Sequence, residues 1–195
     1  MSLNYVKAEK ISLKDNKDYP ELNEKWVEDL IVKDPSILGL GDLDVKDRQR
    51  SQPKAGRLDL LLKDPETDKR YEVELMLGSV DESHIIRTIE YWDIEKRRWP
   101  QYEHVAVIIA ENITTRFLNV INLFNSSIPL IAIQMNALKS GDQVILHFAK
   151  VLDEVIRGSE EEENGGGEID RAYWEKKGSK STLEIVDTCL EILRE

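Results

Sequence analysis

Cysteine and histidine are scarce in this 195-residue sequence, and their scarcity excludes several kinds of site. The single cysteine, Cys189, has no partner for an internal disulfide. The three histidines are scattered and have no cysteines at the spacing of a structural zinc site. Because a chain without disulfides suits a reducing compartment, we expect the protein to be cytoplasmic.

Long apolar runs and phosphate-binding glycine loops are also missing. The most apolar run, residues 105–110, is far too short to span a bilayer, and no basic-then-apolar leader opens the chain. Gly39 and Gly41 lack the third glycine of a Gly-x-Gly-x-x-Gly loop. We therefore expect a soluble protein with no membrane partner, in which 41% apolar residues suffice for one packed domain.

Acidic residues outnumber basic ones and give a net charge of −11, which argues against a general nucleic-acid binder. The excess is concentrated late in the chain, because residues 158–195 hold 11 acidic and five basic side chains. A phosphate backbone could bind along an earlier basic stretch. An isolated basic stretch is, however, more often an ordinary solvent-exposed strand and loop. Its basic residues are Lys46, Arg48, Arg50, Lys54 and Arg57.

Apolar periodicity divides the chain into four segments. An N-terminal extension (1–19) precedes a domain of helices and strands (20–157). An acidic, glycine-rich linker (158–169) follows, and the last residues (170–195) form a helical appendage too small to fold alone. Within the domain we expect, in order, a helix at 20–33, a strand at 43–49, a hairpin at 56–77, a helix at 80–99, a strand at 103–110, a helix at 114–124, strands at 129–135 and 143–148, and a short helix at 151–157.

The hairpin is the part of the chain on which the functional prediction depends. Its two halves, 56–63 and 70–77, alternate in polarity and are separated by turn residues. If residues 65–68 form the loop, paired positions sum to 133, and Asp59 lies opposite Glu74. The same rule predicts two further pairs on that face, Arg57 with Met76 and Leu61 with Glu72, and places Leu58, Leu60 and Leu62 on the opposite face.

Two facing carboxylates, with Cβ atoms about 5 Å apart, repel one another unless a cation lies between them. A divalent metal is one candidate for that cation. The alternative is a solvated face on which the acids meet by chance and have Arg57 and Lys63 as partners. The hairpin pattern alone leaves both interpretations open.

The helix expected after the hairpin carries two different stripes. Its start has capping-box spacing at residues 79–82, and Pro100 stops it. One stripe is apolar and suited to packing, whereas the other can carry charge and donate hydrogen bonds, as in a site or a partly exposed flank. The apolar stripe is Ile85, Ile89 and Trp92, and the second stripe is His84, Arg87 and Tyr91.

The order helix, strand, hairpin, helix, strand, with Gly56-Arg57-x-Asp59 followed by Glu74-Leu75, resembles the PD-(D/E)XK nuclease superfamily, in particular its RecB-like and archaeal-type endonuclease branch. The resemblance covers roughly residues 20–135. It implies an α/β fold of the restriction-endonuclease type, in which helices flank a mixed central sheet, here with a small C-terminal helical appendage.

The resemblance also implies a metal site. In the family an Asp and a Glu on adjacent strands bind Mg²⁺, and the residue after the Glu lends its backbone carbonyl. Carried over to this chain, these roles fall to Asp59, Glu74 and Leu75, with Mg²⁺ or Mn²⁺ as the ion. Glu28, on the first helix, would approach the ion directly or through water.

One position departs from the family. Met76 stands where the family has a lysine that helps to activate water, and a thioether can neither donate a proton nor polarise a water. The missing cation could come from Arg57, or from Arg87 of the Arg87-x-x-x-Tyr91 pair that lies where RecB-like relatives carry Gln-x-x-x-Tyr. An arginine stays protonated, so it would stabilise charge but would be a poor general base.

The leading hypothesis is a Mg²⁺-dependent nuclease acting on nucleic acid, expected to be DNA. A second hypothesis is a nucleic-acid-binding module that kept the scaffold and lost turnover with the lysine, and a third is a protein-interaction domain regulated by its acidic tail. A homo-oligomer is a further alternative, and so is a missing C-terminal partner domain, which the unfinished look of the last helix suggests. The expected nucleic-acid contacts are Lys46, Arg48, Arg50, Lys54 and His84.

Overall fold

The computed structural model describes residues 5–155, together with residues 183 and 187. The chain divides into two units, Met1–Val155 and Ile156–Glu195. The linker and nearly all of the helical appendage predicted for residues 158–195 therefore lie outside the described residues. No helix in the described part of the chain is long and apolar enough to cross a membrane.

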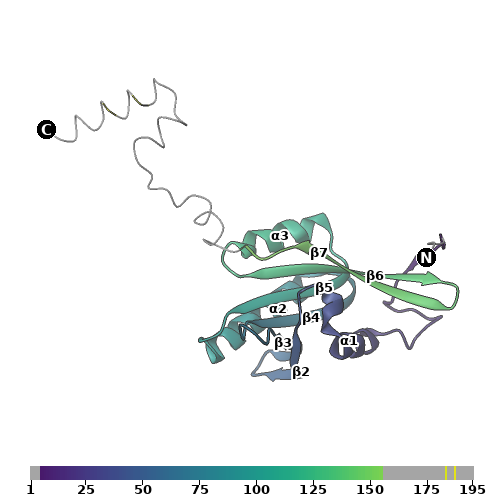
Figure 1. Ribbon diagram of the computed structural model, residues 1–195, viewed down its shortest axis with the longest axis horizontal. Coiled ribbons are helices and arrows are strands. Elements are labelled where there is room, and N and C mark those ends of the chain that lie inside the picture. Colours follow the sequence, from purple (N-terminus) through teal and green to yellow (C-terminus); the bar gives the residue numbers. More distant parts are fainter. Residues whose placement is uncertain (1–4, 156–182, 184–186, 188–195) are drawn as a thin grey trace. The chain divides into compact units, whose positions relative to one another are not determined.

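A mixed sheet forms the centre of the first unit (Figure 1). Its strands follow the order β1-β6-β5-β4-β3-β2, and β7 also pairs with β6. The β4–β5 and β5–β6 pairs are parallel, and the remaining pairs are antiparallel. The strands are β1 (Glu9–Ile11), β2 (Asp44–Gln52), β3 (Gly56–Lys63), β4 (Arg70–Ser79), β5 (His104–Asn112), β6 (Leu130–Ser140) and β7 (Gln143–Leu152).

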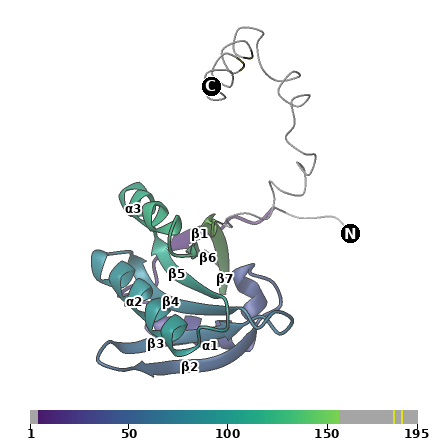
Figure 2. The ribbon, with the colours of Figure 1, turned by 90° about the vertical axis from the view of Figure 1, so that its left-hand side faces the viewer.

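Helices flank this sheet (Figure 2). The parallel pairing of β5 with β6, with a helix between them in the chain, confirms the predicted crossover. The arrangement also confirms the predicted α/β fold with a mixed central sheet. The helical elements are α1 (Glu24–Lys33), the short 3-10 helix η1 (Pro35–Leu38), α2 (Glu82–Arg98) and α3 (Thr115–Asn125).

Two apolar clusters place the helices on opposite faces of the sheet. Val27 of α1 packs in one cluster with Val107 of β5. Ile85 of α2 and Ile121 of α3 pack in the other cluster with Ile108, the next residue of β5. Because successive strand residues point to opposite faces, α1 covers one face, and α2 and α3 cover the other.

Both long helices near the hairpin begin later than predicted. The first begins at Glu24 rather than Pro20, because Asn23 is its N-cap and its side chain accepts the Trp26 N–H. The second begins at Glu82 because Asp81, not Ser79, caps it. The predicted capping box is therefore wrong, and a single aspartate replaces it.

Two elements at the ends of the unit differ from the prediction. Residues 9–11, within the predicted N-terminal extension, pair with β6 as β1. A strand of three residues is too short for its alternation to be recognised in the sequence. The helix predicted at 151–157 is wrong at its start, because Val151 and Leu152 complete β7, where Leu152 pairs with Ala132.

The predicted hairpin register is confirmed. The described ladder between β3 and β4 consists of pairs whose numbers sum to 133, from Lys63 with Arg70 to Leu60 with Val73. The loop between them is closed by a hydrogen bond from the Asp64 N–H to the Lys69 carbonyl. The sequence therefore places each hairpin residue against the correct neighbour as far as Leu60.

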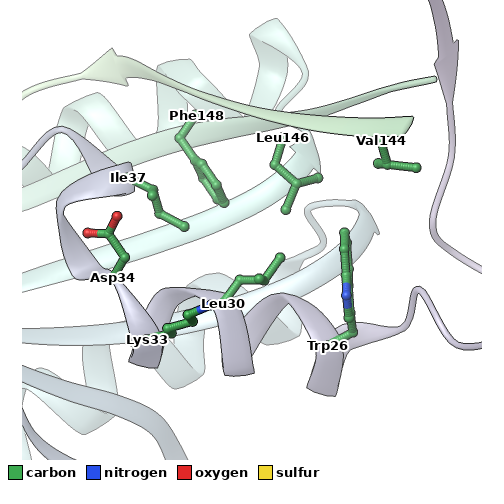
Figure 3. A pocket seen from close by; sticks show the side chains of 8 residues that line it. All are labelled: Trp26, Leu30, Lys33, Asp34, Ile37, Val144, Leu146 and Phe148. Carbon is green, nitrogen blue, oxygen red and sulfur yellow. The ribbon is translucent and has the colours of Figure 1, made fainter. Parts of the chain in front are cut away.

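An apolar groove lies between α1, η1 and β7 (Figure 3). None of the predicted site residues lines it, so the groove is separate from the candidate site. Its lining residues are Trp26, Leu30, Lys33, Asp34, Ile37, Val144, Leu146 and Phe148.

The buried Glu111, in β5, fastens the N-terminal segment to the end of β4. Its carboxylate accepts hydrogen bonds from the backbone N–H groups of Leu13 (2.7 Å), Lys14 (3.2 Å) and Gly78 (2.6 Å), and from the Ser12 hydroxyl (3.2 Å). Three backbone donors from two distant segments thus share one acceptor.

Glu111→Ala should lower the free energy of unfolding by about 3 kcal/mol, because buried N–H groups lose their acceptor. Urea denaturation measures this change. Glu9→Ala is the matched control, since Glu9 is exposed on β1 and should cost little. Equal losses for the two variants would contradict the fastening role.

Candidate active site

The strand alternation of β3 breaks at Asp59. Leu60 packs in the cluster on the α1 face, whereas Leu61 packs on Tyr91 of α2, as alternation requires. Leu58 also packs with Leu61 and Tyr91, although an unbroken strand would place it with Leu60. The prediction that Leu58 shares a face with Leu60 and Leu62 is therefore wrong. Asp59 is the residue at which the alternation of β3 changes face.

The facing strand β2 breaks at the same place. Arg48 contacts Glu28 of α1, whereas Arg50 contacts Glu95 of α2. Gln49 between them has a φ of +49°, in the left-handed region that side chains other than glycine adopt at a cost of about 1–2 kcal/mol. The ladder pairs Arg48 with Leu60 and Arg50 with Leu58 and leaves Gln49 and Asp59 unpaired between them, while its register shift lies between Val45 and Asp47. We call the matched irregularity at Gln49 and Asp59, one residue on each strand, a paired bulge. Bulges of this kind re-aim side chains beside active sites.

This bulge, defined by Gln49 and Asp59, turns both side chains toward α1. The Gln49 Nε2 group donates to Glu28 Oε2 at 3.2 Å and to Asp59 Oδ1 at 3.1 Å. The other Asp59 oxygen accepts the Leu75 N–H at 2.9 Å. Leu75 was predicted to contribute its carbonyl to a metal, and the structure places its amide against the same carboxylate.

Like charges gather at Asp59. Burial raises the pKa of Asp59 to about 6. The hydrogen bonds from Leu75 and Gln49 oppose this rise, while the charges of Glu24 and Glu28 add to it. A buried carboxylate that faces two further carboxylates is a typical environment for a bound cation or for acid–base chemistry.

Glu74 lies on the α2 side of β4 and is almost fully buried. Its Oε1 accepts a hydrogen bond from the Arg87 guanidinium, and its Oε2 is buried with no hydrogen-bond partner among the described residues. The Arg87 guanidinium carbon lies 5.9 Å from the centre of the Tyr91 ring. Arg87 therefore reaches the predicted site residue from α2, as its helical stripe predicts.

Tyr91 packs against the backbone at the start of β3 and has no described hydrogen bond to a carboxylate. Its hydroxyl donates to the Ala55 carbonyl at 3.0 Å. A Cβ at Gly56 would lie 2.8 Å from that hydroxyl, and Gly56 has a φ of +111°. Glycine is therefore required at this position, and the structure assigns Tyr91 to packing.

The structure does not place the Asp59 and Glu74 carboxylates side by side as predicted, because Asp59 turns toward Glu28 of α1 and Glu74 turns toward Arg87 of α2. The Leu75 amide joins Asp59 to β4, whereas Glu74 turns to Arg87. In the part of the chain that the structure describes, no three His, Cys, Asp or Glu side chains are grouped closely enough to hold a metal. A shared ion between the two carboxylates therefore stays a prediction.

The available donors nevertheless suit a hard cation. Glu74 Oε2 is an orphaned buried acceptor, and the Gln49 amide bridges two carboxylate oxygens in the way a cation would. Mg²⁺ and Mn²⁺ prefer such oxygen ligands. Glu28 and Asp59 would hold the ion, with the Leu75 carbonyl as a further donor, whereas the free oxygen of Glu74 lies on the α2 side of β4.

Met76 and Arg57 do not face each other as predicted. The described β3–β4 ladder ends at Leu60, and Arg57 is exposed and pairs with Ser51 of β2. Met76 is 4% exposed and packs in the apolar cluster with Ile85. Of the two arginines predicted to replace the lysine, Arg87 therefore contacts a predicted ligand, and Arg57 is not placed beside one.

The basic stretch divides into internal and exposed cations. Arg48 donates to Glu28 Oε1 at 2.5 Å, and its Nη1 lies 2.6 Å from Asp29 Oδ1. Lys46 and Lys54 are exposed. Arg48 therefore neutralises a predicted metal ligand, and its contact with nucleic acid stays a prediction.

Arg50 has a similar internal role. It binds Glu95, which is fully buried on α2 and also accepts from Gln52 at 2.8 Å and from Arg98. A second Arg50 nitrogen lies 2.7 Å from Asp47. His84, also predicted to contact nucleic acid, has its ring Nδ1 2.7 Å from the capping Asp81.

A second buried charged pair lies farther along β4. His104 Nδ1 is 2.7 Å from Glu72 Oε1, and its Nε2 is 3.0 Å from the Trp99 carbonyl. Because a carbonyl only accepts, Nε2 carries a proton, and the Nδ1 contact must hold a second one. Burial raises the pKa of Glu72 to about 7, although the hydrogen bond from His104 opposes the rise.

The sequence predictions missed Gln49, Glu95 and the Glu72–His104 pair. Glu95 carried a usable signal, since it lies four residues after Tyr91 on the same helix face. Gln49 carried none, because a regular strand would turn it to the opposite face.

Comparison with known proteins gives matches to solved structures. No protein-family model and no curated protein matches the sequence. One similar structure is the "EndoMS-dsDNA2 complex", with 13% identity, a TM-score of 0.48, and coverage of 57% of this chain and 44% of that chain. Another is a repair endonuclease from Pyrococcus abyssi, with 17% identity, a TM-score of 0.46, and coverage of 52% and 43%. The chain spans less than half the length of either structure.

The buried acids predict an unusual dependence of stability on pH. The pKa values of Asp59 and Glu72 are raised from 3.8 and 4.5 to about 6 and about 7, so the folded state binds these protons more tightly. Their stabilisation is fully present below about pH 4 and is lost as the pH rises through 6 to 7. Asp59→Asn should therefore be more stable than the wild type by about 2–3 kcal/mol at about pH 7.5.

Chemical denaturation at several pH values checks this prediction, and the variant should also show a smaller fall in stability between about pH 5 and 7.5. The exposed Asp42→Asn is the control and should behave as the wild type. An undiminished fall in Asp59→Asn would show that Asp59 does not titrate in this range.

Proposed function

We propose that this protein is a Mg²⁺- or Mn²⁺-dependent nuclease whose site lies where β3 separates from β4. The observation that carries the proposal is the bulge at Gln49 and Asp59, which gathers buried carboxylates at a cost in stability. Folds keep such costly arrangements mainly at functional sites. The proposal takes nucleic acid, expected to be DNA, as the substrate.

The proposed roles follow from the position of each side chain. Glu28 and Asp59 would hold the ion, and Glu74 would join them as a third ligand only by turning away from Arg87. When bound, the ion supplies an activated water and neutralises charge on the scissile phosphate. The Arg87 guanidinium is 38% exposed, so it can contact a phosphate while it orients Glu74. Proton transfer must pass through water or a carboxylate, because no described contact places a lysine at these acids.

One observation favours a second candidate, a nucleic-acid-binding module that does not cleave. Met76 is buried in an apolar cluster, and each carboxylate already has a protein donor: Arg48 and Gln49 on Glu28, Gln49 on Asp59, and Arg87 on Glu74. A scaffold that lost its metal would need such internal neutralisation. Measurements of cleavage and of metal binding separate the two candidates.

The first test is cleavage of a panel of single- and double-stranded nucleic acids with Mg²⁺ or Mn²⁺. If the protein is a nuclease, Asp59→Asn and Glu74→Gln should reduce the rate by at least about 100-fold, because each removes a charged ligand. Glu66→Gln is the matched control, since Glu66 is exposed in the loop of the same hairpin. Equal activity in all three variants would point to a contaminating nuclease.

Met76→Lys separates a working enzyme from an inherited scaffold. In an inactive scaffold, the lysine should raise cleavage above background, since a positioned acid–base group contributes about 10²- to 10⁴-fold. In an active enzyme it should change the rate only modestly. Circular dichroism must first show that the variant is folded, because residue 76 is buried. No cleavage by either protein, with no metal binding by calorimetry, would reject both candidates.

The exposed lysines give a separate prediction about binding. Lys46→Ala and Lys54→Ala should each weaken binding to DNA and reduce the slope of log affinity against log salt by about 0.9 for each phosphate that the variant no longer neutralises. Fluorescence anisotropy at several salt concentrations measures the slope. Lys17→Ala, at an exposed position before α1, is the control. A similar change of slope in this variant would show that DNA does not bind specifically at Lys46 and Lys54.

A further inference from the structure

The Gln49 side chain occupies the space between two carboxylates. Its single nitrogen lies 3.2 Å from Glu28 Oε2 and 3.1 Å from Asp59 Oδ1. Both of these acidic residues are buried, at 5% and 8% exposed. An amide nitrogen has two hydrogens, so this one group satisfies one oxygen of each acid.

A divalent ion held by the same two oxygens would need the same space. Mg²⁺ binds oxygen at about 2.0–2.1 Å, and its charge repels an N–H donor. The Gln49 nitrogen and the ion therefore exclude each other. The second oxygen of Glu28 remains with Arg48 and the second oxygen of Asp59 with the Leu75 amide, so both acids stay oriented when Gln49 leaves.

Among the described residues, these two hydrogen bonds are the polar contacts that hold the Gln49 side chain in place. The residue is exposed, so its amide can move into solvent. Its left-handed backbone conformation aims the side chain at the acids and is unfavourable for glutamine. The neighbouring Arg48 and Leu60 are held in the ladder, which keeps the bulge in position.

We propose that the Gln49 amide is an internal competitor for the divalent ion, so that metal binding requires the amide to leave Glu28 and Asp59. This inference rests on the proposed metal site and adds a regulatory residue to it. In the absence of the ion, the Gln49 amide then occupies the ion's position and donates hydrogen bonds to Glu28 and Asp59.

The test uses Gln49→Met in the full chain. Methionine has a similar length, but it has neither the amide donor nor a hard oxygen ligand. Titration calorimetry with Mn²⁺ should show about tenfold tighter binding than the wild type, because the ion no longer displaces two hydrogen bonds to charged groups. Gln143→Met, at an exposed position on β7, is the control and should bind Mn²⁺ as the wild type does.

Gln49→Ala repeats the test with a smaller side chain and should also tighten binding. The rise in melting temperature on adding Mn²⁺ should be larger in both variants than in the wild type, which a purely structural role would not produce.

Weaker Mn²⁺ binding in both variants would overturn the inference, because it would make the Gln49 carbonyl oxygen a ligand. Unchanged binding in both would also overturn it while leaving the proposed metal site intact. No Mn²⁺ binding in the wild type or in either variant would reject the metal site and, with it, the competitor role.

Discussion

The paired bulge at Gln49 and Asp59 is the constraint on which the rest of the candidate site depends. Without it, Asp59 would continue the alternation of β3 and lie on the face of Leu61 and Tyr91. With it, Asp59 lies near Glu28 instead, and burial beside other acids raises its pKa. The bulge thus converts an ordinary strand residue into part of a carboxylate group that needs a donor or a cation.

The need for donors explains where several cations of the protein lie. Removing a charge from water costs several kcal/mol unless a partner with good geometry compensates. Arg48 and Arg50 of β2 form ion pairs with the buried carboxylates of Glu28 and Glu95. Arg87 of α2 forms an ion pair with Glu74. The basic stretch consequently offers fewer free cations than its composition suggests, and its exposed part consists of Lys46, Lys54 and Arg57.

The same donors define the choice between an enzyme and a binding module. Gln49 and Arg87 donate hydrogen bonds to the acids, whereas the orphaned oxygen of Glu74 keeps one acceptor available. Met76 packs in an apolar cluster, and its thioether cannot take part in proton transfer. Catalysis would therefore depend on how easily an ion displaces these donors.

The sequence alone determined the order of the central elements, the hairpin register from Lys63 to Leu60 and the helix face that carries Arg87, because these follow from local periodicity. Tertiary structure decided the face of Asp59, the partner of each arginine and the role of Gln49. Period-two alternation cannot predict a bulge, which arises from pairing between strands and from packing against α1. Likewise, an arginine on a strand has the same local pattern whether it meets solvent or a buried acid, so only the assembled fold distinguishes the two.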